Sequence, residues 1–148
     1  MGLFLFMFII IMSNNYNKHG KLETLLDNNS VTYARITYFG GGSGRSASPP
    51  EYTFQLKDKK IISVFYNVRF CKKVSQRNQF NFSKNKFPVI YNPTNPEINQ
   101  ILLKIEDYYK YNVPIPDTLA EVLVKYFNCD QYRVVRQEGK QTKIVKIK

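Results

Sequence analysis

The sequence has no tryptophan, a single histidine and only two cysteines among its 148 residues. The histidine, His19, is distant in sequence from both cysteines, so the chain lacks the paired ligand spacing of a zinc site. A cysteine nucleophile needs a neighbouring base, and His19 lies in a polar stretch near the N-terminus. The acids Glu106 and Asp107 are adjacent and would point in different directions on a helix, so they do not form an acid–base pair. The sequence therefore predicts no catalytic residue, no metal and no cofactor, and indicates a protein that is not an enzyme.

The two cysteines, Cys71 and Cys129, leave the redox state of the protein open. In an oxidising compartment they could form one disulfide, and otherwise they would remain two separate thiols. Nothing in the local sequence distinguishes these states. We expect free or buried thiols.

The glycine-rich loop at residues 40–50 contains a formal match to the dinucleotide-binding pattern G-x-G-x-x-A at Gly42–Ala47. That chemistry requires a helix directly after the glycines, whose N-terminal amides bind the pyrophosphate. Here Pro49 and Pro50 follow, and a new strand begins. The pattern therefore predicts a loop between two strands.

Acidic residues are few, with 11 Asp and Glu against 22 Lys and Arg, and the formal net charge is +11. Such a charge is typical of proteins that bind nucleic acid or an anionic membrane. An AT-rich genome would also produce it, because Lys, Asn, Ile and Tyr are enriched together while Ala and Gly are scarce. We do not expect a nucleic-acid partner, since no binding signature accompanies the charge. Contact of segments 57–86 and 133–148 with nucleic acid or an anionic surface is the alternative. The candidate contacts are Lys59, Lys60, Arg69, Lys72, Lys73 and Arg77.

The one long apolar run is MGLFLFMFIIIM at residues 1–12. A helix of that length spans roughly 18 Å, less than the ~30 Å hydrocarbon core of a bilayer. The run also lacks the basic start and the cleavage site of a signal peptide. Three interpretations remain: a truncated or mis-started transmembrane helix, an atypical signal sequence, or a membrane-embedded stub. Together they predict membrane association or export through the N-terminus.

The side of the membrane stays open. Lys18 and Lys21 follow the apolar run, and no charged residue precedes it. By the positive-inside rule, a spanning segment with these flanks would leave the domain in the cytoplasm. Two charges are too few to decide the orientation.

Residues 31–148 are predicted to form one α+β domain, joined to the apolar segment by a tether at residues 13–30. A short helix around Leu22, Leu25 and Leu26 is possible within this tether. We expect a small curled antiparallel sheet or barrel-like β domain with two C-terminal helices, preceded by an apolar N-terminal helix. Alternation predicts that Ile62 and Val64 lie on one face of the third strand. The expected strands lie near 31–39, 51–57, 61–70 and 87–91, the expected helices near 96–110 and 117–128, and a basic hairpin or tail at 131–148.

A corner between the fourth strand and the first helix is the most sharply patterned stretch. Asn92-Pro93 predicts a turn, because proline disfavours helical geometry in the residue before it. Asn95 is a suitable helix N-cap and Pro96 suits the first helical position. The predicted corner residues are Tyr91, Pro93, Asn95 and Pro96. Asp117 or Thr118 is the expected cap of the second helix.

Four short motifs carry a resemblance to a known group of proteins. They are T-x-A-x-I at Thr32–Ile36, Y-x-F at Tyr52–Phe54, V-x-Y-x-P-x-N-P at Val89–Pro96, and P-D-T-L at Pro116–Leu119. The chain resembles small bacterial membrane-anchored β-rich domain proteins of unknown function over most of residues 31–120. The resemblance implies the fold and the membrane association, and it implies no catalytic residue. We therefore expect a membrane-associated, non-enzymatic binding or structural domain that acts on a protein partner or on the envelope surface.

Overall fold

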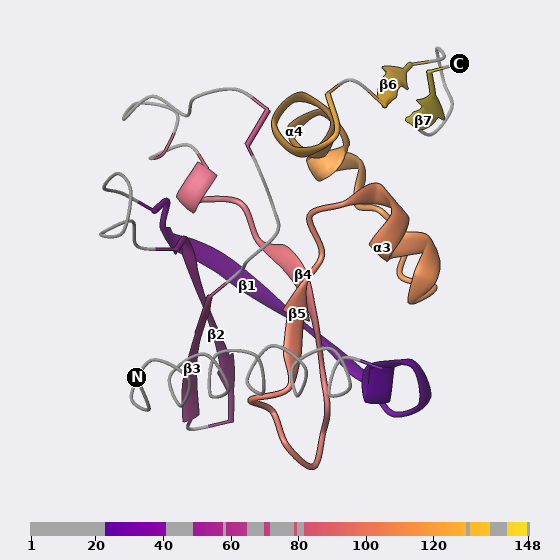
Figure 1. Ribbon diagram of the computed structural model, residues 1–148. Coiled ribbons are helices and arrows are strands. Elements are labelled where there is room, and N and C mark those ends of the chain that lie inside the picture. The colour runs from indigo at the N-terminus through magenta and orange to yellow at the C-terminus, as the bar shows by residue number, and fades with distance from the viewer. Residues whose placement is uncertain are drawn as a thin grey trace, which may run out of the picture.

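The computed structural model describes residues 23–40, 49–57, 59–64, 70–71, 79, 82–129, 131–136 and 142–147. These residues form an α+β fold in which a five-stranded antiparallel sheet curls into a half-barrel, with helices beside it (Figure 1). The predicted fold class is confirmed at this level. The expected apolar N-terminal helix at 1–12 lies outside the described residues.

The sheet is built around its longest strand. The strands are β1 (Ser30–Tyr38), β2 (Glu51–Leu56), β3 (Lys59–Val64), β4 (Phe87–Tyr91) and β5 (Asn99–Ile101). Their order is β3-β2-β1-β4-β5, and every neighbouring pair is antiparallel. The predicted hairpin is β2–β3, whose pairing extends to Leu56 opposite Lys59. β1 thus lies at the centre of the half-barrel and pairs with a neighbour on each side, and the outer strand β5 is the shortest.

Ile62 and Val64 share a face of β3, as predicted, but the core residue of this strand is Ile61 on the other face. Phe54 lies opposite Ile61, and Thr53 lies opposite Ile62. Directly opposite residues share a face of the sheet, so Ile61 joins Phe54 in the core and Ile62 points to solvent. Their exposed fractions are 5% and 61%. The short turn after Leu56 sets this register, and a shift of one residue exchanges the two faces.

The helix predicted at 96–110 begins nine residues later. The structure has a turn at 96–98, the strand β5, and then α3 (Ile105–Lys110). β5 forms because its residues pair with β4, with Asn99 opposite Tyr91 and Ile101 opposite Val89. The apolar spacing that indicated a helix face is shared by strand and helix segments, and tertiary pairing decides between them.

The folded unit begins earlier than the predicted boundary at residue 31. Residues 23–27 form a short helix, and Leu25 on it is fully buried in the core. The Asn29 side chain donates a hydrogen bond to the Leu25 carbonyl and ties this helix to the start of β1. The described part of the predicted tether therefore belongs to the domain.

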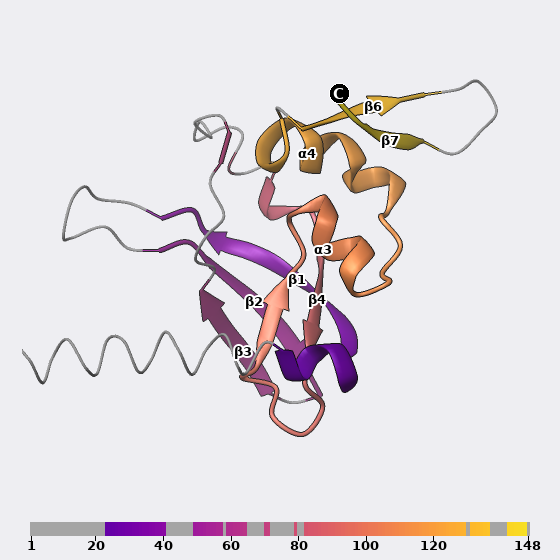
Figure 2. The same ribbon diagram turned by 45° about the vertical axis from the view of Figure 1, so that its right-hand side comes forward.

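The C-terminal part contains α4 (Asp117–Phe127) and a hairpin of β6 (Tyr132–Val135) and β7 (Lys143–Lys146) beside it (Figure 2). The expected side-chain cap of α4 is wrong. Pro116 occupies the N-cap position without a side-chain hydrogen bond, because proline with an extended backbone already ends the preceding segment. Asp117 lies instead in the first turn, where a carboxylate is favourable to the helix dipole.

A cluster of aromatic rings around Phe82 joins the sheet to α4. The Phe82 ring stacks on Phe87 of β4 at 5.8 Å between centroids. It also makes edge contacts with Tyr126 at 4.9 Å and Phe127 at 5.6 Å, both on α4. Edge-to-face pairs add to the stability gained from burial, so this cluster fixes α4 against the sheet.

The buried side chain of Asn128 fixes α3 relative to α4. Its amide nitrogen donates to the carbonyls of Leu103 at 3.0 Å and Leu123 at 2.9 Å. Its side-chain oxygen accepts from the Ile105 amide at 3.2 Å. That amide is the first of α3 and has no partner within its helix. Asn128, which is only 4% exposed, therefore satisfies one backbone group of α3, one of α4 and one of the segment between β5 and α3.

We predict that Asn128→Ala lowers the free energy of unfolding by about 3 kcal/mol or more, because each buried group left without a partner costs about 1–3 kcal/mol. Urea denaturation followed by circular dichroism measures the change. Gln131→Ala, an exposed side chain in the same turn, is the matched control and should change stability little. Equal effects of the two substitutions would show that the Asn128 contacts do not support the fold.

Candidate functional site

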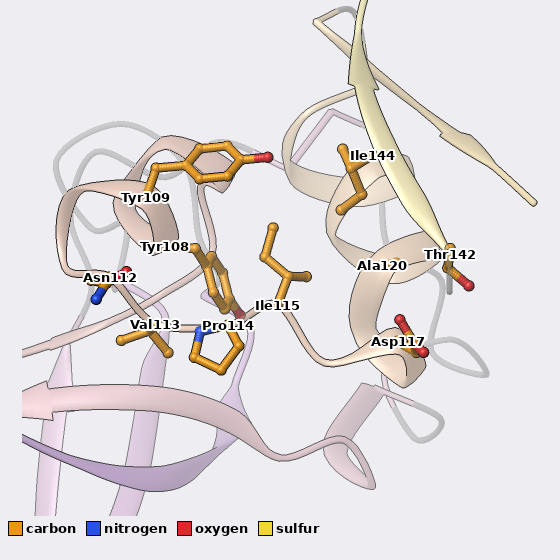
Figure 3. A pocket seen from close by; sticks show the side chains of 10 residues that line it. All are labelled: Tyr108, Tyr109, Asn112, Val113, Pro114, Ile115, Asp117, Ala120, Thr142 and Ile144. Atoms are coloured by element: carbon orange, nitrogen blue, oxygen red, sulfur yellow. The ribbon is translucent and has the colours of Figure 1, made fainter. Parts of the chain in front are cut away.

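A cavity of about 400 Å³ opens between α3, the α3–α4 connection, α4 and β7 (Figure 3). Its lining residues are Tyr108, Tyr109, Asn112, Val113, Pro114, Ile115, Asp117, Ala120, Thr142 and Ile144. Its volume is within the range of small-molecule sites in proteins. It is therefore a candidate binding site.

The α3–α4 connection forms one wall of the cavity because of its backbone. Asn112 has a positive φ of 52°, a conformation that asparagine adopts more readily than most residues. The Val113 amide donates to the Tyr108 carbonyl at 2.9 Å, which ends α3 tightly. Pro114 and Pro116 then keep the chain extended, so that Ile115 faces the cavity.

The centre of the cavity is apolar and its polar groups lie at the ends. Figure 3 shows Ile115 and Ile144 in the middle, with Asp117 and Thr142 close together at one side. Tyr109 lies at the other side and is 65% exposed. None of the ten lining residues is Lys, Arg, His or Cys. The cavity suits an uncharged apolar group with a hydrogen-bond donor, and it offers nothing to a phosphate.

Two tyrosines next to the cavity have structural roles. The Tyr108 hydroxyl donates to the Leu102 carbonyl at 3.0 Å, and its burial raises its pKa above the ordinary value. The Tyr132 hydroxyl donates to the Glu106 carboxylate at 2.9 Å. Burial is the largest cause that raises the pKa of Tyr132 to about 12, and the hydrogen bond to Glu106 is the second. Both hydroxyls therefore stay protonated at neutral pH and hold α3 in place as donors.

Asn92 organises the predicted corner, and Asn95 is not a helix N-cap. The Asn92 side-chain oxygen accepts from the Thr94 amide at 2.9 Å, the Thr94 hydroxyl at 2.6 Å and the Asn95 amide at 3.1 Å. Asn95 accepts one long bond of 3.3 Å from the Glu97 amide. The strand β5 follows this turn, so no helix begins here. The turn is therefore stabilised by Asn92 at its start and has no helix for Asn95 to cap.

The other predicted corner residues have packing and turn roles. Pro93 is exposed, Pro96 is half-buried, and the ring of Tyr91 lies 6.2 Å from that of Phe54. Pro96 also contributes its carbonyl, which accepts from the Asn99 amide nitrogen at 2.8 Å. The described contacts of the corner are thus those of a structural turn.

A second asparagine ties the corner to the sheet. Asn99 donates to the carbonyls of Pro96 and Glu97 and accepts a short hydrogen bond from the Tyr52 hydroxyl on β2. Burial raises the pKa of Tyr52 to about 12, so its hydroxyl remains a donor. β5 and β2 are therefore linked although they are not neighbours in the sheet.

The predicted basic contacts are placed only in part. Lys59 and Lys60 are exposed at the start of β3, and Lys59 lies 3.8 Å from Glu97 in an exposed ion pair of small stability. The other four predicted contacts, Arg69, Lys72, Lys73 and Arg77, lie outside the described residues.

Cys71 and Cys129 form a disulfide, so the expectation of free thiols is wrong. The Cys71 amide donates to the Tyr126 carbonyl at 2.8 Å, which satisfies a carbonyl in the last turn of α4. This contact brings the Cα atoms of the two cysteines to 6.2 Å. The two residues are 58 positions apart in sequence, which is why local spacing could not reveal the pair.

We predict that Asn92→Ala lowers the free energy of unfolding by about 1–3 kcal/mol, since it removes a shared acceptor from a half-buried turn. Asn95→Ala is the matched control in the same turn and should cost less than about 0.5 kcal/mol. Thermal or urea denaturation of both variants gives the comparison. A larger loss for Asn95→Ala would restore Asn95 as the residue that holds the corner.

Features that would assign the site directly are not found among the described residues. No three His, Cys, Asp or Glu side chains there gather closely enough to hold a metal ion. In the same part of the chain, no helix combines the length and apolar character needed to cross a bilayer, and the run 1–12 lies outside it. Comparison of the chain with models of protein families, with curated proteins and with solved structures finds no match.

Proposed function

We propose that the chain is a membrane-associated, non-enzymatic binding domain of a bacterial envelope, and that it takes an apolar group of a protein partner into the cavity between α3 and α4. The cavity is the observation that carries the binding role. It is large enough for a bulky side chain, and its centre is formed by Ile115, Ala120 and Ile144. Clefts of this composition are the usual binding sites of proteins.

A protein partner is favoured by the mouth of the cavity. Tyr109 stands there with 65% of its surface exposed, beside the aliphatic wall of Val113 and Ile115. Tyrosine is enriched among the residues that anchor protein interfaces, because it combines a large rigid contact area with a hydroxyl donor. An aliphatic or aromatic side chain inserted beside Tyr109 would be desolvated on three sides.

The disulfide supports a location outside the cytoplasm. Disulfides such as Cys71–Cys129 persist in oxidising compartments and are rare where glutathione and thioredoxin keep thiols reduced. The lysines that follow the apolar run favour the opposite orientation, but they number only two, Lys18 and Lys21. We give the covalent bond more weight and propose that the domain lies on the outer side of the membrane that holds residues 1–12.

We predict that the full-length protein sediments with membranes, resists extraction at alkaline pH, and is degraded when protease is added to spheroplasts. Its thiols should react with a maleimide reagent only after reduction. Deletion of residues 1–12 is the control, and the deleted form should be soluble with its thiols free in the cytoplasm. Membrane-bound protein with free thiols and protection from protease would place the domain on the inner side.

We predict that a photoreactive residue in place of Tyr109 forms an adduct with one discrete protein in cells of the source organism. Ile144→Asp should abolish that adduct, because it puts a charge into the apolar centre of the cavity. The same photoreactive residue at Gln131, exposed beyond the end of α4, is the control position. Mass spectrometry identifies the adduct. An adduct that persists with Ile144→Asp, or that also forms at Gln131, would contradict a role for the cavity.

A further inference from the structure

One face of the sheet carries exposed side chains over β1, β2 and β3, and no described residue packs on them there. Along β1 the side chains of Ala34 and Ile36 are buried, so Tyr33 and Arg35 point to the other face. Arg35 lies opposite Thr53, and Thr53 lies opposite Ile62, which places these three side chains in one row across the strands.

The bare sheet face, as we call it, combines apolar and basic side chains. Three large hydrophobic residues on it are strongly exposed, namely Val31 at 47%, Tyr33 at 55% and Ile62 at 61%. Arg35 and Lys60 are exposed between them, with Lys60 two residues before Ile62 on β3. The bare sheet face is defined by Val31, Tyr33, Arg35, Thr53, Lys60 and Ile62.

The same face is covered where it continues over β4 and β5. Val31 lies opposite Ile90, and Ile90 lies opposite Gln100, so all three share the face. Ile90 is nevertheless fully buried, because the end of α3 lies above it: the Tyr111 hydroxyl donates to the Gln100 side chain at 3.1 Å. Among the described residues, the half of this face over β4 and β5 is thus covered, and the half toward β3 is exposed.

We propose that the bare sheet face docks on the anionic headgroups of the membrane that anchors the chain. This proposal rests on the membrane association proposed above. The charge of the bare sheet face is complementary to such a surface, since Arg35 and Lys60 are exposed among its apolar residues. Glu51 is the only acid on the same face of β1, β2 and β3, and it is half-buried at the end of β2 away from the hairpin turn. Basic residues attract a protein to anionic lipids, and exposed tyrosine and aliphatic side chains settle at the headgroup level.

The length of the connection holds this face near the bilayer. The apolar run ends at Met12 and β1 begins at Ser30, so 17 residues lie between them. A fully extended chain of that length reaches at most about 60 Å. The helix at 23–27 shortens that reach. The bare sheet face starts on the first residues of β1 and is therefore kept at a high local concentration next to the membrane surface.

A lipid surface fits the bare sheet face better than single-stranded nucleic acid does. Binding of single strands depends on successive bases stacking on aromatic rings, with basic residues along the backbone. Tyr33 and Tyr38, which lies opposite Glu51, are the rings on this face of the described strands; they are five residues apart on β1, and Val31 and Ile62 offer no stacking surface. Aliphatic side chains gain free energy on leaving water for the headgroup boundary, whatever their shape.

The absence of tryptophan allows a direct test, because one introduced Trp is the only one in the chain. Ile62→Trp in the full-length protein, reconstituted with phosphatidylcholine and phosphatidylglycerol vesicles that contain brominated lipid, should show blue-shifted and quenched emission. In phosphatidylcholine alone the quenching should be much weaker. Thr118→Trp, exposed on α4 at the other end of the molecule from β3, is the matched control and should be unquenched in both lipids (Figure 2).

Replacing the two basic residues of the bare sheet face by acids distinguishes docking of this face from anchoring of the chain by residues 1–12. Each removed basic residue weakens the attraction to anionic lipid about fivefold. Arg35→Glu with Lys60→Glu in the Ile62→Trp chain should therefore abolish the quenching while the protein still floats with the vesicles.

Equal quenching of Ile62→Trp in both lipids, or equal quenching of Thr118→Trp, would overturn the docking proposal. Failure to float at all would instead overturn the membrane association. An emission change of the Ile62→Trp chain with single-stranded DNA, but not with phosphatidylglycerol, would assign the face to nucleic acid.

Discussion

The three hydrogen bonds of the buried Asn128 side chain fix α3 relative to α4. They connect the start of α3 with the last turn of α4, and the Asn128 carbonyl also accepts from the amides of Gln131 and Tyr132, where the hairpin begins. The cavity lies between these same elements, so its shape follows from the angle that Asn128 sets between α3 and α4. A buried amide has this effect because leaving any of its partners unpaired is costly.

The disulfide and the aromatic cluster act on the same end of α4. Cys71 caps the Tyr126 carbonyl and is bonded to Cys129, while Phe82 packs on the rings of Tyr126 and Phe127. A disulfide that closes a loop of this length stabilises the folded state by about 2–4 kcal/mol, chiefly by restricting the unfolded chain. The C-terminal end of α4 is therefore fixed by three independent means: the disulfide, the aromatic cluster and Asn128. Its N-terminal end carries Asp117 and lines the cavity, at a distance from all three.

The elements that could be predicted from the sequence are those whose determining contacts are local. The β2–β3 hairpin and α4 could be predicted, because alternation and helical spacing are properties of a few consecutive residues. The strand β5 was not predicted, because its apolar residues have the spacing of a helix and only their pairing with β4 makes them a strand. The role of Asn128 was not predicted either, because its partners lie 23 and 25 positions away in sequence. The cavity was missed for the same reason, since Tyr109 and Ile144 come from elements that only the fold brings together. An asparagine immediately after a strongly amphipathic helix was the one available signal for the Asn128 contacts.

The bare sheet face and the cavity would act together if the domain docks on the membrane while it binds a partner. The bare sheet face extends toward β3, whereas the cavity lies beside α4 and β7 at the other end of the molecule (Figure 1). An anchor at residues 1–12 followed by ten residues of chain, 13–22, would not by itself restrict the rotation of the domain relative to the membrane. Docking of Tyr33 and Ile62 on the headgroups would remove most of that rotation and turn the cavity away from the bilayer. Binding of a partner would then cost less orientational entropy, because part of that cost would already be met by the membrane.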